Sequence, residues 1–253
     1  MSQSIAFYAN AVPLSRERHR DVHVAQGEGY AFARSINAVP LTLVEFPQAA
    51  LEYPIVIAGE GETLAPFAVL GIEDRQNLFI DERGGWDGRY IPAFVRRYPF
   101  VFARSEDGRN FTVCIDEAFV GVNREGKGEA LFDAEGERTP YLEKVLAFLG
   151  EYQRQHVRSH QLCVRLEALE LLEPMQARLS MPGGRRFGLS GFRVVNRERL
   201  RRLAAVDLEK LARNDELELV HAHLLSLLNF DRMVGRLAAA HGDAGGQPPP
   251  AAD

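Results

Sequence analysis

The chain has 253 residues, of which 46% are hydrophobic and 26% are charged, so it belongs among ordinary globular proteins with a substantial core. Its formal net charge of -5 gives no overall attraction for phosphate backbones, which argues against nucleic acid as a partner. The two cysteines lie in apolar segments and do not indicate a disulfide framework. No run approaches the roughly 18 apolar residues of a membrane span, so we expect a soluble, cytoplasmic protein with no membrane span.

The first part of the chain, residues 1–34, mixes short apolar pieces with a charged run at 15–21. Val22-His23-Val24 then alternates apolar and polar residues, which is typical of an edge strand. We therefore interpret residues 1–34 as an N-terminal arm that lies on a main domain of residues 35–237.

Short β-type runs broken by turn residues follow between positions 41 and 122. Pro54 and Pro99 each stand just before an apolar run, where the missing N–H costs a strand least, and both mark strand starts. Two more strands are expected at 68–72 and 78–80, and Asp107-Gly108 predicts a hairpin between 100–103 and 111–115. A mostly antiparallel sheet is the expected result.

The second half of the chain is predicted to be helical. Thr139 as N-cap and Pro140 at the first helical position begin a helix with an apolar face. That face consists of Leu142, Val145, Leu146, Leu149 and Tyr152. We expect this helix to end near residues 157–159 and a second one to run over about 160–172.

A hairpin, two helices and a tail complete the prediction. The hairpin joins 177–181 to 186–189 through a Pro182-Gly183-Gly184 turn, Asn196 caps a short helix over 197–203, and the last helix covers 215–237. Residues 238–253 are rich in Ala, Gly and Pro and are predicted to be disordered, so deleting 239–253 should leave the thermal midpoint unchanged. The fold class is therefore α+β, with a mostly antiparallel sheet in the N-terminal half and a helical C-terminal half that contains an additional β-hairpin.

Several strings in fixed order carry a resemblance to a known family. They are SRERHRD at 15–21, NAVPL at 37–41, YPIV at 53–56, NLFI at 77–80, WDGRYIPAFVRRYPF at 86–100, CIDE at 114–117 and HLLSLLN at 223–229. The chain resembles the SapC family over roughly residues 5–237.

The resemblance implies a bacterial setting. Such proteins are associated by name with surface-layer gene clusters, and similar ones lie near flavin-dependent halogenases, cupin-type oxygenases and outer-membrane receptors, without an agreed activity. A permease subunit of a peptide transporter shares the name. A permease needs several apolar spanning helices, which this sequence does not contain.

His19-Arg20-Asp21 has the H-x-D spacing of a facial-triad iron site. A third ligand would have to come from His156, His160, His221 or His223. Too few residues precede His19 to build the β-sandwich that such a site needs. The alternative is a surface cluster of ion pairs in which Arg16, Arg18 and Arg20 interleave with Glu17 and Asp21.

The remaining histidines offer weaker patterns. His156 and His160 would share a face of one continuous helix, but the expected helix end between them favours solvated side chains. His221 and His223, two apart on a helix, face different directions and cannot chelate together. We interpret His223 as a core or capping histidine.

The segment from Gly84 to Arg97 has the composition of a recognition surface, because it combines the only tryptophan with tyrosines, arginines and glycines. The predicted binding residues are Trp86, Arg89, Tyr90, Arg96 and Arg97. The alternative is a core tryptophan at a hairpin, with the arginines paired to Asp81, Asp87 or Asp116.

Two functional hypotheses remain. No nucleophile elbow or phosphate-binding glycine loop is present, and neither cysteine has polar neighbours, so hydrolase, nucleotide-binding and thiol-enzyme functions lose their usual support. The first hypothesis is a non-catalytic accessory or binding protein with a protein or peptide partner and no cofactor. The second is an iron-dependent oxygenase that uses His19, Asp21 and a distal histidine.

Overall fold

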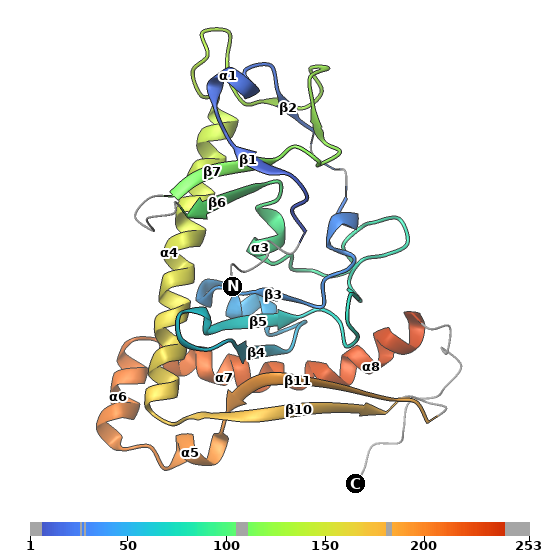
Figure 1. Ribbon diagram of the computed structural model, residues 1–253. Helices are drawn as coiled ribbons and strands as arrows, with labels where there is room; N and C mark the ends of the chain where they lie inside the picture. The colour runs from blue at the N-terminus through green and yellow to red at the C-terminus, as the bar shows by residue number, and fades with distance from the viewer. Residues whose placement is uncertain (1–6, 26, 28, 105–110, 181–183, 241–253) are drawn as a thin grey trace.

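The computed structural model of the chain describes residues 7–25, 27, 29–104, 111–180 and 184–240 (Figure 1). This part of the chain forms three antiparallel sheets, one long helix that runs past the two larger sheets, and a helical C-terminal region. The predicted α+β class is confirmed.

The first sheet ties the N-terminal segment to the middle of the chain. Its strands, in spatial order, are β1 (Ala11–Pro13), β7 (Phe111–Asp116) and β6 (Phe100–Arg104). Asp116 is fully buried, and its two carboxylate oxygens accept the backbone N–H groups of Ala9 at 2.8 Å and Asn10 at 2.9 Å. These bonds fix the start of β1 on the end of β7. The proposed Asp107-Gly108 turn lies outside the described residues.

A second small sheet consists of β8 (Val122–Asn123), β2 (His23–Val24) and β9 (Glu129–Ala130), in that order. The edge-strand interpretation of β2 is wrong, because both neighbours pair with it. Val22 and Val24 are buried together with Leu131. The alternation of apolar and polar residues at 22–24 therefore results from burial of one face of the strand and not from an open sheet edge.

The third and largest sheet combines strands from both halves of the chain. Its spatial order is β10 (Leu172–Ser180), β11 (Arg186–Val195), β4 (Ile55–Ala58), β5 (Ala65–Val69) and β3 (Ala38–Pro40). The C-terminal hairpin is longer than predicted, and it extends the N-terminal sheet where Arg193 pairs with Ile57. Pro182 and Gly183 of its predicted turn lie outside the described residues. The strand predicted at 78–80 is reduced to a single bridge between Ile80 and Trp86.

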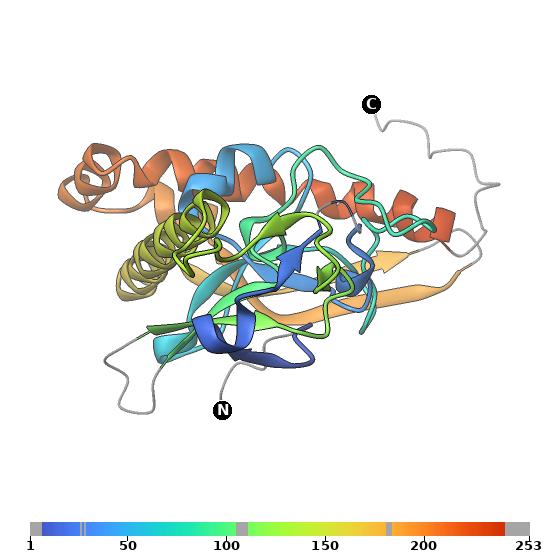
Figure 2. The same ribbon diagram turned by 90° about the horizontal axis from the view of Figure 1, so that it is seen from above.

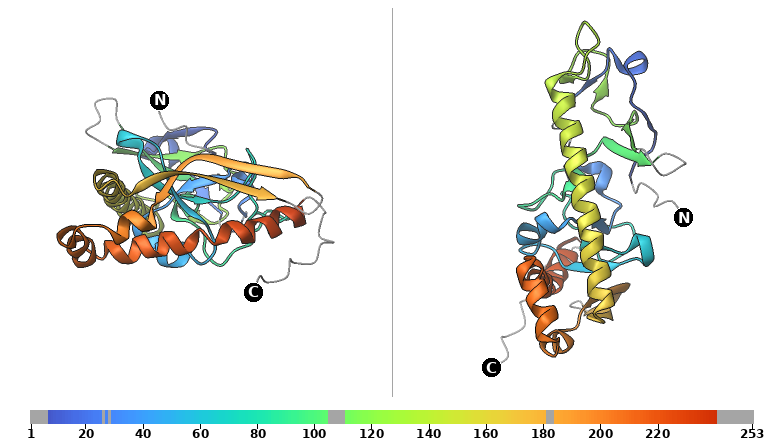
Figure 3. Two further views of the ribbon diagram at one scale, coloured as in Figure 1. Left: turned by 90° about the horizontal axis from the view of Figure 1, so that it is seen from below. Right: turned by 90° about the vertical axis from the view of Figure 1, so that its left-hand side faces the viewer.

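Helix α4 (Pro140–Ala168) begins at the predicted cap, where the Thr139 side chain accepts from the Leu142 N–H. It is one helix of roughly 43 Å, and the two helices predicted here are wrong. The reason is Ser159, which is fully buried: its hydroxyl donates to the Gln155 carbonyl at 2.7 Å and accepts from the Leu43 N–H at 3.0 Å. Figures 1 and 3 show α4 running along one side of the molecule past both larger sheets.

The N-terminal half of α4 packs with Leu142 and Leu149 fully buried, whereas Leu146 between them is only partly buried. We expect Leu146→Ala to lower the free energy of unfolding by about 1–2 kcal/mol, because only part of this side chain leaves water on folding. Leu142→Ala is the matched comparison and should cost more in the same urea titrations. Equal losses at the two positions would contradict the packing described.

Four helices follow the hairpin: α5 (Arg197–Arg201), α6 (Ala205–Arg213), α7 (Glu216–Ser226) and α8 (Asn229–Ala240). The Asn196 cap is confirmed, since its side chain accepts from the Arg199 N–H at 2.8 Å. The single helix predicted over 215–237 is two helices. Asn229 is the first residue of α8. Its buried side-chain amide donates to the carbonyls of Ala50 at 2.8 Å and Tyr53 at 3.2 Å.

The C-terminal helices cover one face of the five-stranded sheet (Figure 2). Figure 3 shows α8 beside the β10–β11 hairpin, and Phe230, Met233 and Leu237 of this helix are buried there with Phe192. Within the described residues no helix is both long enough and apolar enough to cross a membrane. Residues 241–253, most of the predicted tail, lie outside the described part, and the deletion stays a prediction.

Both cysteines pack as small hydrophobic residues, as predicted. Cys114 lies buried in β7 and Cys163 in α4. Burial raises the pKa of the Cys163 thiol to about 12, so this thiol stays protonated at neutral pH.

Candidate functional site

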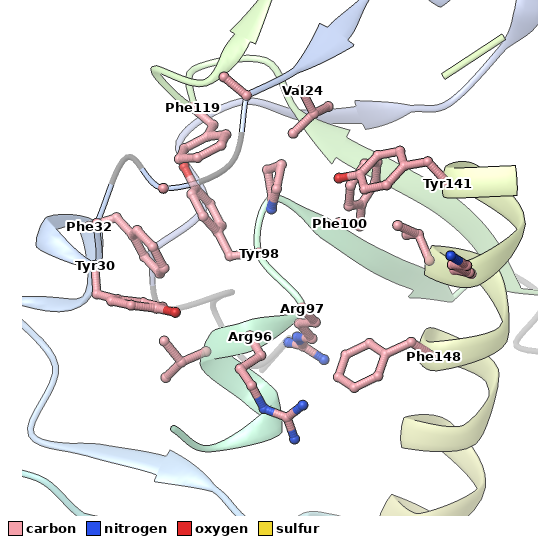
Figure 4. A pocket seen from close by; sticks show the side chains of 17 residues that line it. Val24, Tyr30, Phe32, Arg96, Arg97, Tyr98, Phe100, Phe119, Tyr141 and Phe148 are labelled. Carbon is pink, nitrogen blue, oxygen red and sulfur yellow. The ribbon is translucent and has the colours of Figure 1, made fainter. Parts of the chain in front are cut away.

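A cavity of about 540 Å³ opens between α4, the connection from α3 (Ala93–Arg96) to β6, and the loop that follows β2 (Figure 4). We call it the aromatic groove. Its aromatic lining consists of Tyr30, Phe32, Tyr98, Phe100, Phe119, Tyr141 and Phe148, and its charged lining of Arg96, Arg97 and Lys144. Among the described residues, no aspartate or glutamate lines the groove.

A buried carboxylate fixes the element that carries the two arginines. Glu45 is 3% exposed, and its Oε1 accepts the Ala93 N–H at 2.7 Å and the Tyr90 hydroxyl at 2.9 Å. Its Oε2 accepts the N–H and the hydroxyl of Thr42 at 2.8 Å and 2.7 Å. The Ala93 and Tyr90 bonds hold the start of α3, and the two Thr42 bonds fix the carboxylate itself. Arg96 and Arg97 follow one turn later at the groove.

Arg97 is partly buried and has no carboxylate partner within the described part of the chain. Its Cζ lies 4.1 Å from the ring centroid of Phe94 and 5.0 Å from that of Tyr152. The Nε atom is buried and has no hydrogen-bond partner among the residues that the structure describes. Ring faces therefore stabilise this cation without neutralising it, and a buried donor remains open.

Tyr8 is the polar neighbour of Arg97. Its hydroxyl donates to the Phe100 carbonyl at 2.7 Å. Burial raises the pKa of Tyr8 to about 12, although the adjacent Arg97 charge favours the phenolate. Tyr8 is therefore neutral at physiological pH and does not compensate the guanidinium.

Arg96 and Lys144 are exposed at the groove. The Arg96 Nε donates to the Ile91 carbonyl at 2.9 Å, and its Cζ lies 5.3 Å from the ring centroid of Phe148. In Figure 4 the rings of Tyr98 and Tyr141 project from opposite sides of the groove. Three cations next to apolar rings give the groove a positive potential, although the whole chain is acidic.

The five residues predicted for binding do not form one site. Arg96 and Arg97 line the aromatic groove, whereas Arg89 is exposed and contacts Glu52 only through its backbone N–H, at 2.7 Å. The Tyr90 hydroxyl is occupied by Glu45.

Trp86 is partly buried behind the groove. Its Nε1 donates to the Tyr53 hydroxyl at 3.0 Å, and its ring contacts Phe79 and Tyr30. Only Tyr30 connects the indole to the groove lining. The indole therefore belongs to the packing of the hairpin at 80–86.

The acidic partners suggested for the arginines are engaged elsewhere. Asp87 pairs with Arg236 at 2.6 Å, and Asp81 accepts the Gly85 N–H at 2.7 Å. Asp116 accepts backbone N–H groups near the N-terminus. These contacts leave Arg97 with ring faces and the neighbouring Tyr8 side chain as its partners.

Most of the groove lining was missed from the sequence, because it comes from segments far apart in the chain. Tyr30 and Phe32 precede β3, Tyr98 lies in the connection between α3 and β6, Phe100 begins β6, Phe119 follows β7, and Tyr141 and Phe148 come from α4. The sequence did contain one signal for the groove, the spacing of its residues in α4. Tyr141, Val145 and Phe148 are three to four residues apart, with Lys144 beside Val145, so they share one face of the helix.

The two iron ligands proposed near the N-terminus, His19 and Asp21, lie in different environments. His19, at the end of α1 (Arg16–His19), is fully buried with its Nδ1 3.1 Å from the Ser15 carbonyl, whereas Asp21 is exposed. The His19 Nε2 lies 3.4 Å from a Glu117 oxygen without hydrogen-bond geometry. Burial is the main cause that lowers the pKa of His19.

The ion pairs around α1 differ from those suggested by the sequence. Arg18 pairs with Glu117 and Arg16 lies 4.0 Å from Glu137, so the acidic partners come from later in the chain and not from the charged run itself. Across the described residues, His, Cys, Asp and Glu side chains do not gather in threes in a way that would hold a metal ion.

His156, His160 and His223 pack against neighbouring groups. Because α4 is continuous, His156 and His160 share a face, but that face is packed: His160 Nδ1 lies 2.9 Å from the Leu64 carbonyl, and His156 stacks on Tyr152. The interpretation of both as solvated is therefore wrong. His223 is a core histidine, as predicted, and lies between β4 and β11.

The protein is of the α+β class, and it carries a cavity lined by aromatic rings and by the side chains of Arg96, Arg97 and Lys144. The SapC family model matches residues 14–233, and the chain belongs to the SapC family. No curated protein and no solved structure matches the chain.

Proposed function

We propose that this chain is a non-catalytic accessory or binding protein whose aromatic groove receives part of a peptide or protein partner. The supporting observation is Arg97, a partly buried cation held by ring faces, with an open buried donor at Nε. Rigid rings offer contact area at low conformational cost, and a guanidinium adds directed hydrogen bonds to an anion. A cytoplasmic location and a partner associated with the surface layer or outer membrane belong to the same proposal, and rest on the sequence and the family resemblance.

The iron-dependent alternative has less support from the residues themselves. His19 is enclosed by Ser15 and Glu117, while the carboxylate of Asp21 is exposed. His160 is hydrogen-bonded to the Leu64 carbonyl, and His223 is hydrogen-bonded within the core. A ligand set built from these side chains would require rearrangement of packed elements, whereas the aromatic groove is already open.

A photo-cross-linking experiment tests the binding function. The photoreactive analogue p-benzoylphenylalanine replaces Phe148 in the groove, and in a matched control it replaces Val206, which is 57% exposed on α6. We expect irradiation in the native cell to attach a peptide-containing partner at position 148 and not at position 206. Attachment of the same partner at both positions, or of no peptide at position 148, would contradict the proposal.

A further inference from the structure

We propose that the aromatic groove binds the free C-terminus of a peptide chain whose last residue has an aromatic or large apolar side chain. This inference rests on the proposed binding function and names the part of the partner that enters the groove. It follows from what the groove offers to a ligand and from what it lacks.

The backbone of the groove lining offers few hydrogen bonds. The N–H groups of Ala25, Tyr30 and Phe100 already donate to the carbonyls of Gly121 at 2.8 Å, Gly84 at 2.7 Å and Arg97 at 2.8 Å. Pro99 has no N–H to donate. At these four positions no N–H is therefore free to pair with an added strand, which disfavours binding of an internal peptide segment there by strand addition.

The donors that remain are side chains. Arg97 has a buried Nε without a partner, and Arg96 and Lys144 lie in the same lining. All three carry positive charge, so the matching ligand group is an anion that accepts several hydrogen bonds, as a carboxylate does.

The position of the cations against the rings favours a chain terminus over an internal acidic residue. The Arg96 Cζ lies 5.3 Å from the ring centroid of Phe148, so charge and apolar surface adjoin. A C-terminal residue carries its carboxylate and its side chain on one carbon. The carboxylate can therefore contact the cations while the side chain contacts the rings. An internal Asp or Glu would also bring two peptide groups into the groove, where they would lose water without gaining partners.

Calorimetric titration with a matched pair of probes tests this inference. The first probe is an N-acetylated tetrapeptide of three glycines and a terminal phenylalanine with a free carboxylate, and the second is the same peptide as its C-terminal amide. We expect the free acid to bind at least about tenfold more tightly, because the amide loses charge-assisted hydrogen bonds. A peptide that ends in serine should also bind more weakly, because it leaves the rings uncovered.

Variants distinguish binding in the aromatic groove from nonspecific attraction of the peptide by positive charge elsewhere on the protein. Arg97→Leu and Arg96→Leu should each weaken binding of the free acid by about tenfold or more, while Arg89→Leu, an exposed arginine outside the lining, should stay within about twofold. Circular dichroism and urea unfolding check that each variant is folded. If Arg97→Leu does not fold, Arg96→Leu and Lys144→Gln decide the question, because both side chains are exposed.

Four results would overturn the inference. The first two are equal binding of acid and amide, and unchanged binding in the groove variants. The third is binding of 3-phenylpropionate as tight as that of the peptide, which would show that the peptide chain does not contribute to the affinity. The fourth is no binding of the free acid up to millimolar concentration. If cross-linking at position 148 still captures a peptide in these cases, the binding function stands and only the C-terminal recognition fails.

Discussion

We expect Glu45→Ala to lower the free energy of unfolding by about 3–5 kcal/mol. The carboxylate is 3% exposed and accepts four hydrogen bonds, from the Thr42 N–H and hydroxyl, the Tyr90 hydroxyl and the Ala93 N–H. Alanine leaves these donors without an acceptor in a buried position, and each unsatisfied group is costly. Urea unfolding followed by circular dichroism measures the loss.

Two further variants sharpen this result. Glu62→Ala removes an exposed carboxylate and should change stability by less than about 0.5 kcal/mol. Glu45→Gln keeps the shape of the side chain but places an amide NH₂ against hydrogen-bond donors. Its loss of stability should therefore lie between those of Glu62→Ala and Glu45→Ala. A loss below about 1 kcal/mol for Glu45→Ala would show that the carboxylate does not hold α3 in place.

Acidification from pH 7 to pH 4 should remove about 3 kcal/mol of stability through His223 alone. Burial lowers the pKa of this imidazole to about 4 in the folded protein, against about 6.5 in the unfolded chain. Its Nε2 accepts the Val195 N–H at 3.0 Å, and its Nδ1 lies 2.8 Å from the Ile55 carbonyl, which fixes the neutral tautomer.

The sign follows from proton binding. Above about pH 6.5 both states are neutral, and this histidine adds no pH dependence. Between about 6.5 and 4 the unfolded chain binds a proton that the folded protein does not, so stability falls as the pH falls. Below about 4 both states are protonated and the loss from this group is complete.

Urea titrations at several pH values measure the effect. His223→Gln should show a smaller fall in stability between pH 7 and pH 4 than the wild type, whereas His221→Gln, on the exposed face of α7, should retain the full fall. An unchanged pH profile in His223→Gln would mean that other groups carry the acid sensitivity.

Features of the fold that depend on neighbouring residues were predictable from sequence. Thr139 and Asn196 cap their helices, and Pro54 stands immediately before β4, because each of these side chains acts on backbone groups within a few residues. The fold class and the burial of His223 were inferred in the same way, from apolar periodicity and from helix position.

Features that depend on distant partners were not predictable. The segment at 157–159 remains helical because the Ser159 hydroxyl accepts the N–H of Leu43, which is far away in the chain. The last helix breaks where Asn229 bonds to residues 50 and 53. Neither contact leaves a trace in the local sequence pattern.

The candidate site shows the same division. The pair Arg96 and Arg97 was selected from composition, and both line the groove. Trp86 and Tyr90 were selected by the same reasoning, yet their polar groups are occupied by Tyr53 and Glu45. Composition identifies groups that favour recognition, but only the tertiary contacts decide which of them remain open.

The most direct test of the central claim observes the Arg97 guanidinium itself. In a protein labelled with ¹⁵N, the Nε–H resonances of Arg96, Arg97 and Arg89 are assigned by substitution and followed during titration with the free-acid tetrapeptide and its amide. We predict that the Arg97 and Arg96 resonances shift with the acid and not with the amide, while that of Arg89 stays in place. Shifts confined to other parts of the molecule, with an unchanged Arg97 resonance at saturation, would contradict the aromatic groove as the binding site.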